Sequence, residues 1–413
     1  MTTTNAPETD YAAVLIAYLS FIVLGLPGAM LGVAWTSDKW PSIQKTFNLG
    51  LDAVGALFVT FTLGYSLASF ISGRLHGRFN SSTLFFVGSL LSAAALAGYG
   101  TLPAWWLIVA CGTLLGFGSG ILDAGMNIYF AAVFNARLMN WLHACFGIGT
   151  IIGPLLMTTI LSRDGGIWQT GYVIGAGAYL LTGLLFFLTR SRWVNVGRGT
   201  HEEGTQSGVS ARSTLRLPLV WISLGIFLAY AGLEGVSTQW TFPLFNKARG
   251  IDAVTAGTWL VILQASFTIG RIFFGFALAY FKPRTLIRVC AATLITATLL
   301  LIINPIPNAA FIMLMVYGFT LAPIWALMVT NVQERLGPLH GANAIGFMMA
   351  AAGIGVGVLP GIAGVLAYRS NLEVIPIVLF VLSIMMIILY EMTNLRSLQS
   401  RLVRAYNHDF QSK

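Results

Sequence analysis

The chain has 413 residues, of which 56% are hydrophobic and only 9% are charged, and its formal net charge is +9. Soluble proteins carry about 25% charged residues, so this composition excludes an ordinary soluble domain and predicts helices of about 20 residues that span a membrane. In such a protein the excess cations sit in short loops and set the topology, so they give no reason to expect a nucleic-acid partner.

Hydropathy predicts an all-α membrane protein with twelve transmembrane helices. Residues 1–10 form a predicted cytoplasmic tail, and the first apolar segment is too long for a cleaved signal peptide, so it is interpreted as a retained span. The predicted helices cover approximately 11–35, 53–73, 82–100, 104–134, 138–161, 168–189, 217–245, 254–281, 285–303, 308–332, 341–368 and 374–395.

One long polar stretch separates the predicted helices into two sets of six. Residues 190–216 contain GRGTHEEGTQSGVSARST, and this Gly, Ser, Thr and Glu content is typical of a flexible cytoplasmic linker. The chain is therefore divided into an N-terminal bundle at 11–189 and a C-terminal bundle at 217–395. A basic cytoplasmic tail is predicted at 396–413.

The distribution of Lys and Arg predicts that both termini are cytoplasmic, because cytoplasmic loops carry the excess of cations. The cations on the side of the N-terminus are Arg74, Arg78, Arg137, Arg190, Arg192, Arg198, Arg212, Arg216, Lys282, Arg284, Arg288, Arg335, Arg396, Arg401, Arg404 and Lys413. Those on the other side are Lys39, Lys45, Arg163, Lys247, Arg249 and Arg369. This asymmetry favours a multi-pass protein with both ends inside the cell.

The two sets of helices share internal sequence features. A Gly-Arg pair at 73–74 precedes a basic loop in the first set, and Gly270-Arg271 precedes one in the second. A GxxxG pattern at 149–153 corresponds loosely to the one at 353–357. Small residues at this spacing let helix backbones approach closely. Two pseudo-symmetric six-helix bundles of this kind predict a binding site between them, near the middle of the membrane.

Three ionisable residues lie inside predicted spans and are the candidates for proton coupling: Asp123, His143 and Glu234. An ionised Asp in so apolar a segment costs roughly 2.5–3.5 kcal/mol on insertion scales unless it is paired or used. Asp123 and Asn127 are four residues apart, so they share one helix face. The alternative for Asp123 is a structural hydrogen bond between helices, and His143 could be a polar ligand, a proton relay or a structural residue.

Amide and aromatic side chains within the spans are candidates for binding a polyhydroxylated solute, because amides bond hydroxyl groups and rings stack on apolar sugar faces. Each of them is individually more often a packing residue. The substrate-binding candidates are Asn127, Trp141, Tyr230, Gln239, Trp240, Trp325, Asn331 and Asn343. The sequence has no phosphate-binding loop and no HExxH or GxSxG motif in a suitable context, so no cofactor, metal site or enzyme activity is expected.

Two stretches of the sequence resemble a known family of proteins. GFGSGILDAGMN (Gly116–Asn127) and FNARLMNWLHACFGIG (Phe134–Gly149), together with LGVAW and PSIQ near the N-terminus, resemble the fucose–proton symporter branch of the major facilitator superfamily. The resemblance implies proton and sugar handling by Asp123, a position beside the sugar pocket for Asn127, a monomer and a bacterial inner membrane. Relatives carry His or Gln at the position of His143.

Two departures from the family pattern accompany the resemblance. The loop after the second helix, GRLHGRFN, has Gly77 and Asn80 where the family usually places an Asp and a Gly among arginines, so the network of charges at the cytoplasmic gate is thinner. The fucose-transporter type also carries an acidic residue in its first helix. The first helix of this chain has none, which weakens the expectation of fucose as the substrate. The predicted cytoplasmic gate consists of Arg74, Arg78, Arg137 and Arg335.

Together these features predict a secondary transporter that moves a small polyhydroxylated solute, most readily a sugar, in symport with protons by alternating access. The alternative is an exporter that exchanges small drugs or metabolites for protons. A third hypothesis, from a different functional class, is a membrane sensor that binds a sugar without transporting it. The linker and the tail weigh against this hypothesis, because they are short and contain no signalling module.

Overall fold

The computed structural model describes residues 10–35, 40–50, 53–196, 209–304, 306 and 310–394, without the side chains of 253, 254, 338 and 339. The predicted tails, apart from residue 10, and the central part of the predicted linker lie outside these residues. All regular secondary structure in the described part of the chain is helical. Within it, twelve helices are long and apolar enough to cross a membrane, which confirms the predicted class and number.

Six of these helices form the first half of the molecule. They are α1 (Tyr11–Trp35), α3 (Val54–Arg78), α4 (Ser81–Thr101), α5 (Trp105–Val133), α6 (Ala136–Leu161) and α7 (Trp168–Leu188). The short helix α2 (Ile43–Phe47) lies between the first two, and η2 (Arg190–Arg192) follows the last.

The second half begins with the short helix α8 (Ala211–Leu215). Its longer elements are α9 (Pro218–Pro243) with its π-helical extension η3 (Leu244–Ala248), α10 (Ala253–Ala277), α11 (Pro283–Ile303), α12 (Ala310–Leu321), α13 (Ile324–Arg369) and α14 (Val374–Thr393). Gly337 has a non-helical backbone with φ of 65° and divides α13 into two spans. The tenth span runs over Ala310–Gly337, and the eleventh runs over His340–Arg369.

Glycine contacts pack the helices of each half against one another. A Cβ atom on Gly64 of α3 would lie 2.8 Å from the backbone nitrogen of Phe117 in α5, and one on Gly120 would lie 2.6 Å from the carbonyl oxygen of Tyr65. In the second half, a Cβ atom on Gly270 would lie 2.7 Å from the carbonyl oxygen of Phe319. Such close backbone contact leaves little room for sliding, so each half is suited to move as a rigid unit.

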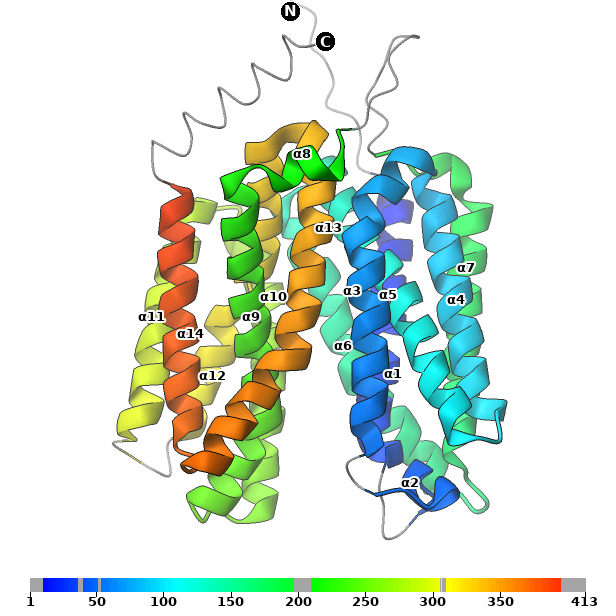
Figure 1. Cartoon of the computed structure of the whole chain (residues 1–413), viewed down its shortest axis with the longest axis vertical. Helices are drawn as coiled ribbons and strands as arrows, with labels where there is room; N and C mark the ends of the chain where they lie inside the picture. The colour runs from blue at the N-terminus through cyan, green and yellow to red at the C-terminus, as the bar shows by residue number, and fades with distance from the viewer. Residues whose placement is uncertain are drawn as a thin grey trace, which may run out of the picture.

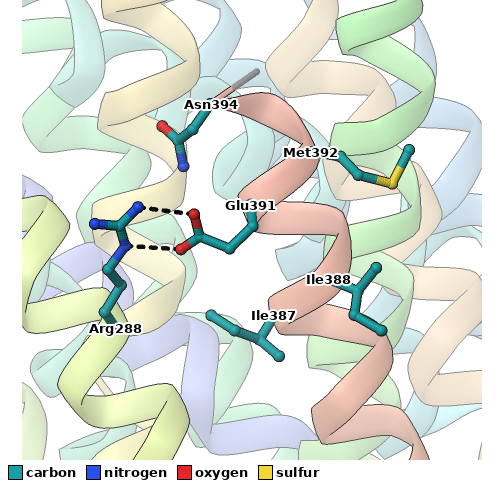
Figure 2. Close-up of a pocket in the computed structure, with 6 residues that line it drawn as sticks. All are labelled: Arg288, Ile387, Ile388, Glu391, Met392 and Asn394. Atoms are coloured by element: carbon teal, nitrogen blue, oxygen red, sulfur yellow. Dashed lines mark hydrogen bonds and ion pairs between the residues drawn. The ribbon is translucent and has the colours of Figure 1, made fainter.

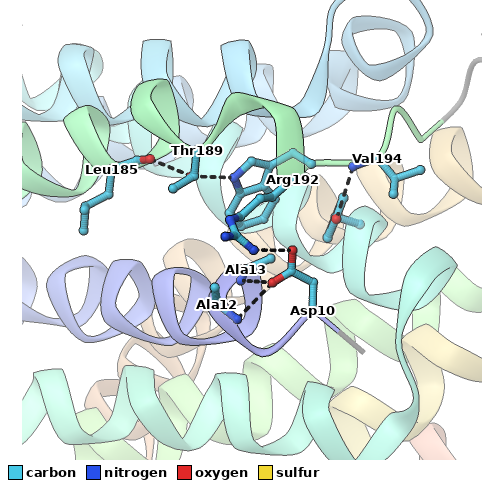
Figure 3. Close-up of polar contacts among 9 residues, drawn as sticks. Asp10, Ala12, Ala13, Leu185, Thr189, Arg192 and Val194 are labelled. Carbon is cyan, nitrogen blue, oxygen red and sulfur yellow. Dashed lines mark hydrogen bonds and ion pairs between the residues drawn. The ribbon is translucent and has the colours of Figure 1, made fainter. Parts of the chain in front are cut away.

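Polar contacts tie the first helix to the end of the first half (Figure 3). The carboxylate of Asp10 accepts hydrogen bonds from the backbone of Ala12 and Ala13 at the start of α1 and pairs with Arg192 at 3.3 Å. Burial acts to raise the pKa of Asp10, but the bonds from Ala13 and Arg192 outweigh it and the pKa lies below its usual value. Asp10 therefore keeps its negative charge at neutral pH and links the two ends of this half.

The two halves stand side by side and are joined through the segment that contains α8 (Figure 1). We call the end of the molecule that carries α8 and the C-terminal end of α14 the linker face, and the other end the opposite face. Helices α3 and α13 run next to each other where the halves meet, and their ribbons spread apart toward the opposite face (Figure 1). The region between the halves is where a transporter site was predicted.

Candidate functional site

Helices α3 and α13 form one half of the interface between the bundles. A Cβ atom on Gly73 would lie 2.5 Å from Cα of Asn343, and one on Gly346 would lie 2.5 Å from the carbonyl oxygen of Ser69. Midway along the helices, Gly353 packs on the side chains of Tyr65 and Ser66. The two helices are therefore in contact from the linker face to the middle of the molecule.

Helices α6 and α10 form the other half of the interface. The indole nitrogen of Trp141 donates to the carbonyl oxygen of Ile272 at 3.4 Å, and its ring covers Gly275. Nearer the middle, Gly147 lies against the side chain of Thr268. Toward the opposite face, by contrast, a Cβ atom added to Gly257 of α10 would meet only open space. The halves are thus in contact on the side of the linker face.

A hydrogen-bonded network centred on Asp123 lies where these contacts reach the middle of the molecule. The hydroxyl group of Tyr65 in α3 donates to Oδ2 of Asp123 in α5. The amide nitrogen of Asn127 donates to Oδ1 of Asp123 at 2.9 Å and is also 2.9 Å from its backbone oxygen. The predicted helical spacing therefore brings Asp123 and Asn127 together, and both carboxylate oxygens have a donor.

The amide oxygen of Asn127 extends the network to both halves of the molecule. It accepts from the indole nitrogen of Trp325, at the start of α13, at 3.3 Å and lies 3.1 Å from Nε2 of His143 in α6. An indole N–H can only donate, which fixes the amide oxygen as the acceptor. Nε2 of His143 must therefore carry a hydrogen, so His143 holds the amide of Asn127 in place.

Aromatic rings enclose this network on the side of the second half. The ring of Trp325 lies 5.7 Å from that of His143, 5.3 Å from Tyr230 and 4.9 Å from Phe227, measured between centroids. The ring of Phe21 in α1 contacts His143 edge-on at 5.5 Å. The predicted residue Trp325 therefore lies next to the predicted residues Asn127 and His143, and Tyr230 packs on Trp325.

The second half contributes a charged pair to the same region. NH2 of Arg271 in α10 lies 3.2 Å from Oε1 of Glu234 in α9. The charges of both residues act on Asp123, and that of Arg271 acts on His143 as well. The predicted residue Glu234 is therefore part of one electrostatic group with Asp123.

The members of this group differ in their access to solvent. Asn127, His143 and Arg271 are buried, whereas Asp123 and Glu234 retain partly exposed surface. The carboxylates thus form the accessible part of the site, and the amide, imidazole and guanidinium groups lie behind them. Such an arrangement can exchange a proton and bind the hydroxyl groups of a solute.

The sequence-based selection missed Tyr65 and Arg271. Tyr65 lies among apolar and hydroxyl residues that show no charge or spacing signal. Arg271 was noted only as part of the Gly-Arg pair that precedes a basic loop, but Lys282, the first cation of that loop, is about 16 Å away along a helix at 1.5 Å per residue. That separation was the available signal that Arg271 lies inside the span.

Several other candidates have partners away from this network. The indole nitrogen of Trp240 donates to the carbonyl oxygen of Pro360 within the second half, at 2.9 Å. The amide of Asn343 donates to the carbonyl oxygen of Val209 at 3.0 Å, next to α8. Gln239 is exposed and Asn331 is half-buried. A role in solute binding stays a prediction for these residues and for Trp141.

The four arginines of the predicted gate have different surroundings. The guanidinium group of Arg137 lies 4.4 Å from the ring of Trp141 and 5.3 Å from that of Phe276, so it spans both halves. Arg335 donates to the backbone oxygen of Thr393 and to Asn394 at the end of α14, within the second half. Arg74 and Arg78 have exposed side chains. The role of these residues in gating stays a prediction.

A surface pocket near the end of α14 is separate from this site (Figure 2). Arg288 of α11 makes two hydrogen bonds of 2.7 and 2.8 Å to Glu391 of α14 there, and the remaining lining side chains belong to α14 or to Asn394, which follows it. Its lining includes no predicted site residue. The pair joins two helices of the second half and is not part of the site at the interface.

Comparison with solved structures supports the architecture. The chain superposes on a transporter named FucP in its outward conformation with a TM-score of 0.76 and 15% identity, over 93% of this chain and 98% of that one. It superposes on the proton:xylose symporter XylE with a TM-score of 0.71 and 15% identity, over 92% and 94% of the two chains. At this identity the likeness establishes the fold.

Comparison with known sequences establishes the family. Bypass of stop codon protein 6 of Saccharomyces cerevisiae is 22% identical over 404 residues, 89% of this chain and 80% of its own length. The human sodium-dependent glucose transporter 1 is 23% identical, over 87% of this chain and 74% of its own length. The model of the Major Facilitator Superfamily matches residues 13–342. The chain therefore belongs to the major facilitator superfamily of transporters.

Proposed function

We propose that this transporter moves a small, neutral, polyhydroxylated solute, most readily a sugar, in symport with protons by alternating access. The observation that carries the proposal is the Asp123 carboxylate at the contact between the halves, bonded to Tyr65 and Asn127. An ionisable group at this depth in a membrane protein marks a substrate or proton pathway by default. Asp123 is also partly accessible, so it can load and release a proton.

The charges of the site favour one proton for each solute. Asp123 and Glu234 together contribute two negative charges when ionised, and Arg271 contributes one positive charge. One proton on Asp123 makes this group neutral, so a neutral solute can then be enclosed without burying net charge. Binding of the proton and closure around the solute are thereby coupled.

The hydrogen bonds favour a proton over a sodium ion as the coupling ion. Hard cations need several oxygen ligands, but both oxygens of Asp123 already accept from a hydroxyl or an amide donor. The amide oxygen of Asn127 is likewise occupied by Trp325 and faces His143. The human relative is named as sodium-dependent, so a sodium gradient belongs in the test.

The neighbouring groups favour a sugar-like solute. Trp325 offers a half-buried ring beside the network, and Asp123 and Glu234 offer partly accessible carboxylate oxygens. Carboxylates accept hydrogen bonds from hydroxyl groups, and rings stack on apolar sugar faces. Two structures with the same fold are named as a fucose:proton and a proton:xylose symporter, which supports this class of solute.

We further propose that the protein is a monomer in the inner (plasma) membrane with both termini in the cytoplasm, as the distribution of cations predicts. With that orientation, the contacts at the linker face close the cytoplasmic side, and the site faces outward in this structure. The similar FucP structure is named as an outward conformation.

Purified protein in liposomes tests the proposal. We expect labelled L-fucose, D-xylose or D-glucose to accumulate under an inward proton gradient and not under a sodium gradient. Asp123→Asn keeps the size of the side chain but cannot exchange a proton, so it should abolish accumulation and leave solute exchange partly intact. Asp164→Asn is the matched control, because Asp164 is exposed between α6 and α7.

Three outcomes would contradict parts of the proposal. Accumulation by Asp123→Asn equal to that of the unmodified protein would exclude its role in coupling. Solute flux without accumulation would identify a facilitator. Efflux driven by an inward proton gradient would instead identify the exporter.

A further inference from the structure

The ion pair between Arg271 and Glu234 is buried unequally. The side chain of Arg271 is 7% exposed and that of Glu234 is 30% exposed. A single bond of 3.2 Å joins them, and Nε of Arg271 is buried without a hydrogen-bond partner. Arg271 therefore lies behind Glu234, where a solute that enters the site would meet the carboxylate first.

A buried cation in this position acts through its field. Arg271 is one turn of α10 from Thr268, which packs on Gly147 of α6. Gly147 is one turn from His143 in the network around Asp123. Coulomb interactions are screened little away from water, so the charge of Arg271 acts on Asp123, which belongs to the other half. A positive charge stabilises an ionised carboxylate, whereas a negative charge opposes ionisation. Arg271 and Glu234 therefore have opposite effects on the same proton.

Four titratable or charged side chains surround Asp123. They are Tyr65 of α3, His143 of α6 through Asn127, Glu234 of α9 and Arg271 of α10. Tyr230 of α9 lies beside Glu234 and Arg271. Arg271 is the cation of this set that lies across the interface from Asp123. Its effect on Asp123 consequently depends on how closely the two halves approach.

We propose that Arg271 is a positioning residue that promotes release of the proton from Asp123 across the interface, and that Glu234 moderates this effect by pairing with Arg271. The inference rests on the proposed function, because it assigns the groups that control its proton. Arg271 belongs to the second half and Asp123 to the first, so rocking of the halves changes the distance between them. That change in distance alters how strongly Asp123 retains its proton.

Infrared difference spectroscopy on the purified protein measures this directly, without a solute. The carboxylic acid band of Asp123 is assigned by its loss in Asp123→Asn, and its pH dependence gives the pH at which Asp123 is half protonated. Arg271→Gln should raise this pH by about one unit, and Glu234→Gln should lower it by about as much. Arg271→Lys, which keeps the charge, should leave it nearly unchanged.

The double variant Arg271→Gln with Glu234→Gln is the matched control. It replaces a neutral ion pair by a neutral pair of amides, so the pH of half protonation should return close to that of the unmodified protein. It also keeps the inference testable if a single variant fails to fold, since a lone buried charge is strongly destabilising.

No shift in either variant, or shifts in the same direction for Arg271→Gln and Glu234→Gln, would overturn the inference. So would a double variant that behaves like either single variant. Failure of the proposed function gives a different result: solute would not accumulate under a proton gradient, whereas the opposite shifts in the infrared titration would persist.

Discussion

Replacing Gly73 by alanine adds one methyl group where α3 touches α13. That Cβ atom would lie 2.5 Å from Cα and 2.6 Å from the backbone nitrogen of Asn343. Two backbones meet there, so no side-chain rotation can relieve the overlap and the halves must separate at the linker face. Overpacking of this kind costs about 1–3 kcal/mol.

The cost applies only to the state in which the linker face is closed. The substitution should therefore shift the ratio of the two states of the transporter by roughly 5- to 150-fold toward an open linker face. Alanine is also a better helix former than glycine, by about 0.5–1 kcal/mol, but this gain is equal in both states. Gly77→Ala is the matched control, because it lies one turn later on the same helix and has the same gain in helix propensity. Its added methyl group would meet open space.

Pulsed electron resonance between spin labels measures the effect. Labels at 55 of α3 and 361 of α13 lie toward the opposite face, at glycines whose Cβ positions are free of contacts. We expect Gly73→Ala to enrich the shorter distance, which reports closure of the opposite face, and Gly77→Ala to match the unmodified protein. Identical distance distributions for the two variants would refute this reasoning.

Two further predictions concern the network around Asn127. Trp325→Phe removes the indole donor and should weaken solute affinity roughly 2- to 12-fold in a binding assay, the equivalent of one hydrogen bond of about 0.5–1.5 kcal/mol. Trp240→Phe is the control and should leave the affinity unchanged. Equal losses of affinity in the two variants would contradict the placement of the site. His143→Gln keeps an N–H donor for Asn127 and should retain gradient-driven accumulation in liposomes, whereas His143→Leu should impair it; loss of accumulation in both variants would instead favour a proton relay.

The central part of the site could be predicted because it depends on local geometry. Asp123 and Asn127 are one helical turn apart, so any helix places them together, as the structure confirms. Composition and hydropathy likewise sufficed for twelve spans, since each span has to be apolar over its own length.

The rest depends on how each helix is rotated about its axis. Trp325 and Trp240 are both tryptophans inside spans of the second half, yet one bonds to Asn127 and the other to Pro360. Nothing in their local sequences distinguishes the two. Tyr65 bonds to Asp123, and Arg271 to Glu234, across helices that are far apart in the sequence, and Gly73 lies beside Asn343 only because the halves are docked.

Movement of protons with the solute is the most direct test of the account. A pH-sensitive dye enclosed in liposomes reports proton entry when the transported sugar (L-fucose, D-xylose or D-glucose) is added outside, with no proton gradient imposed beforehand. The account predicts that the sugar drives entry of about one proton per molecule, and that Asp123→Asn abolishes it. Sugar uptake without proton entry in the unmodified protein would contradict coupling through Asp123.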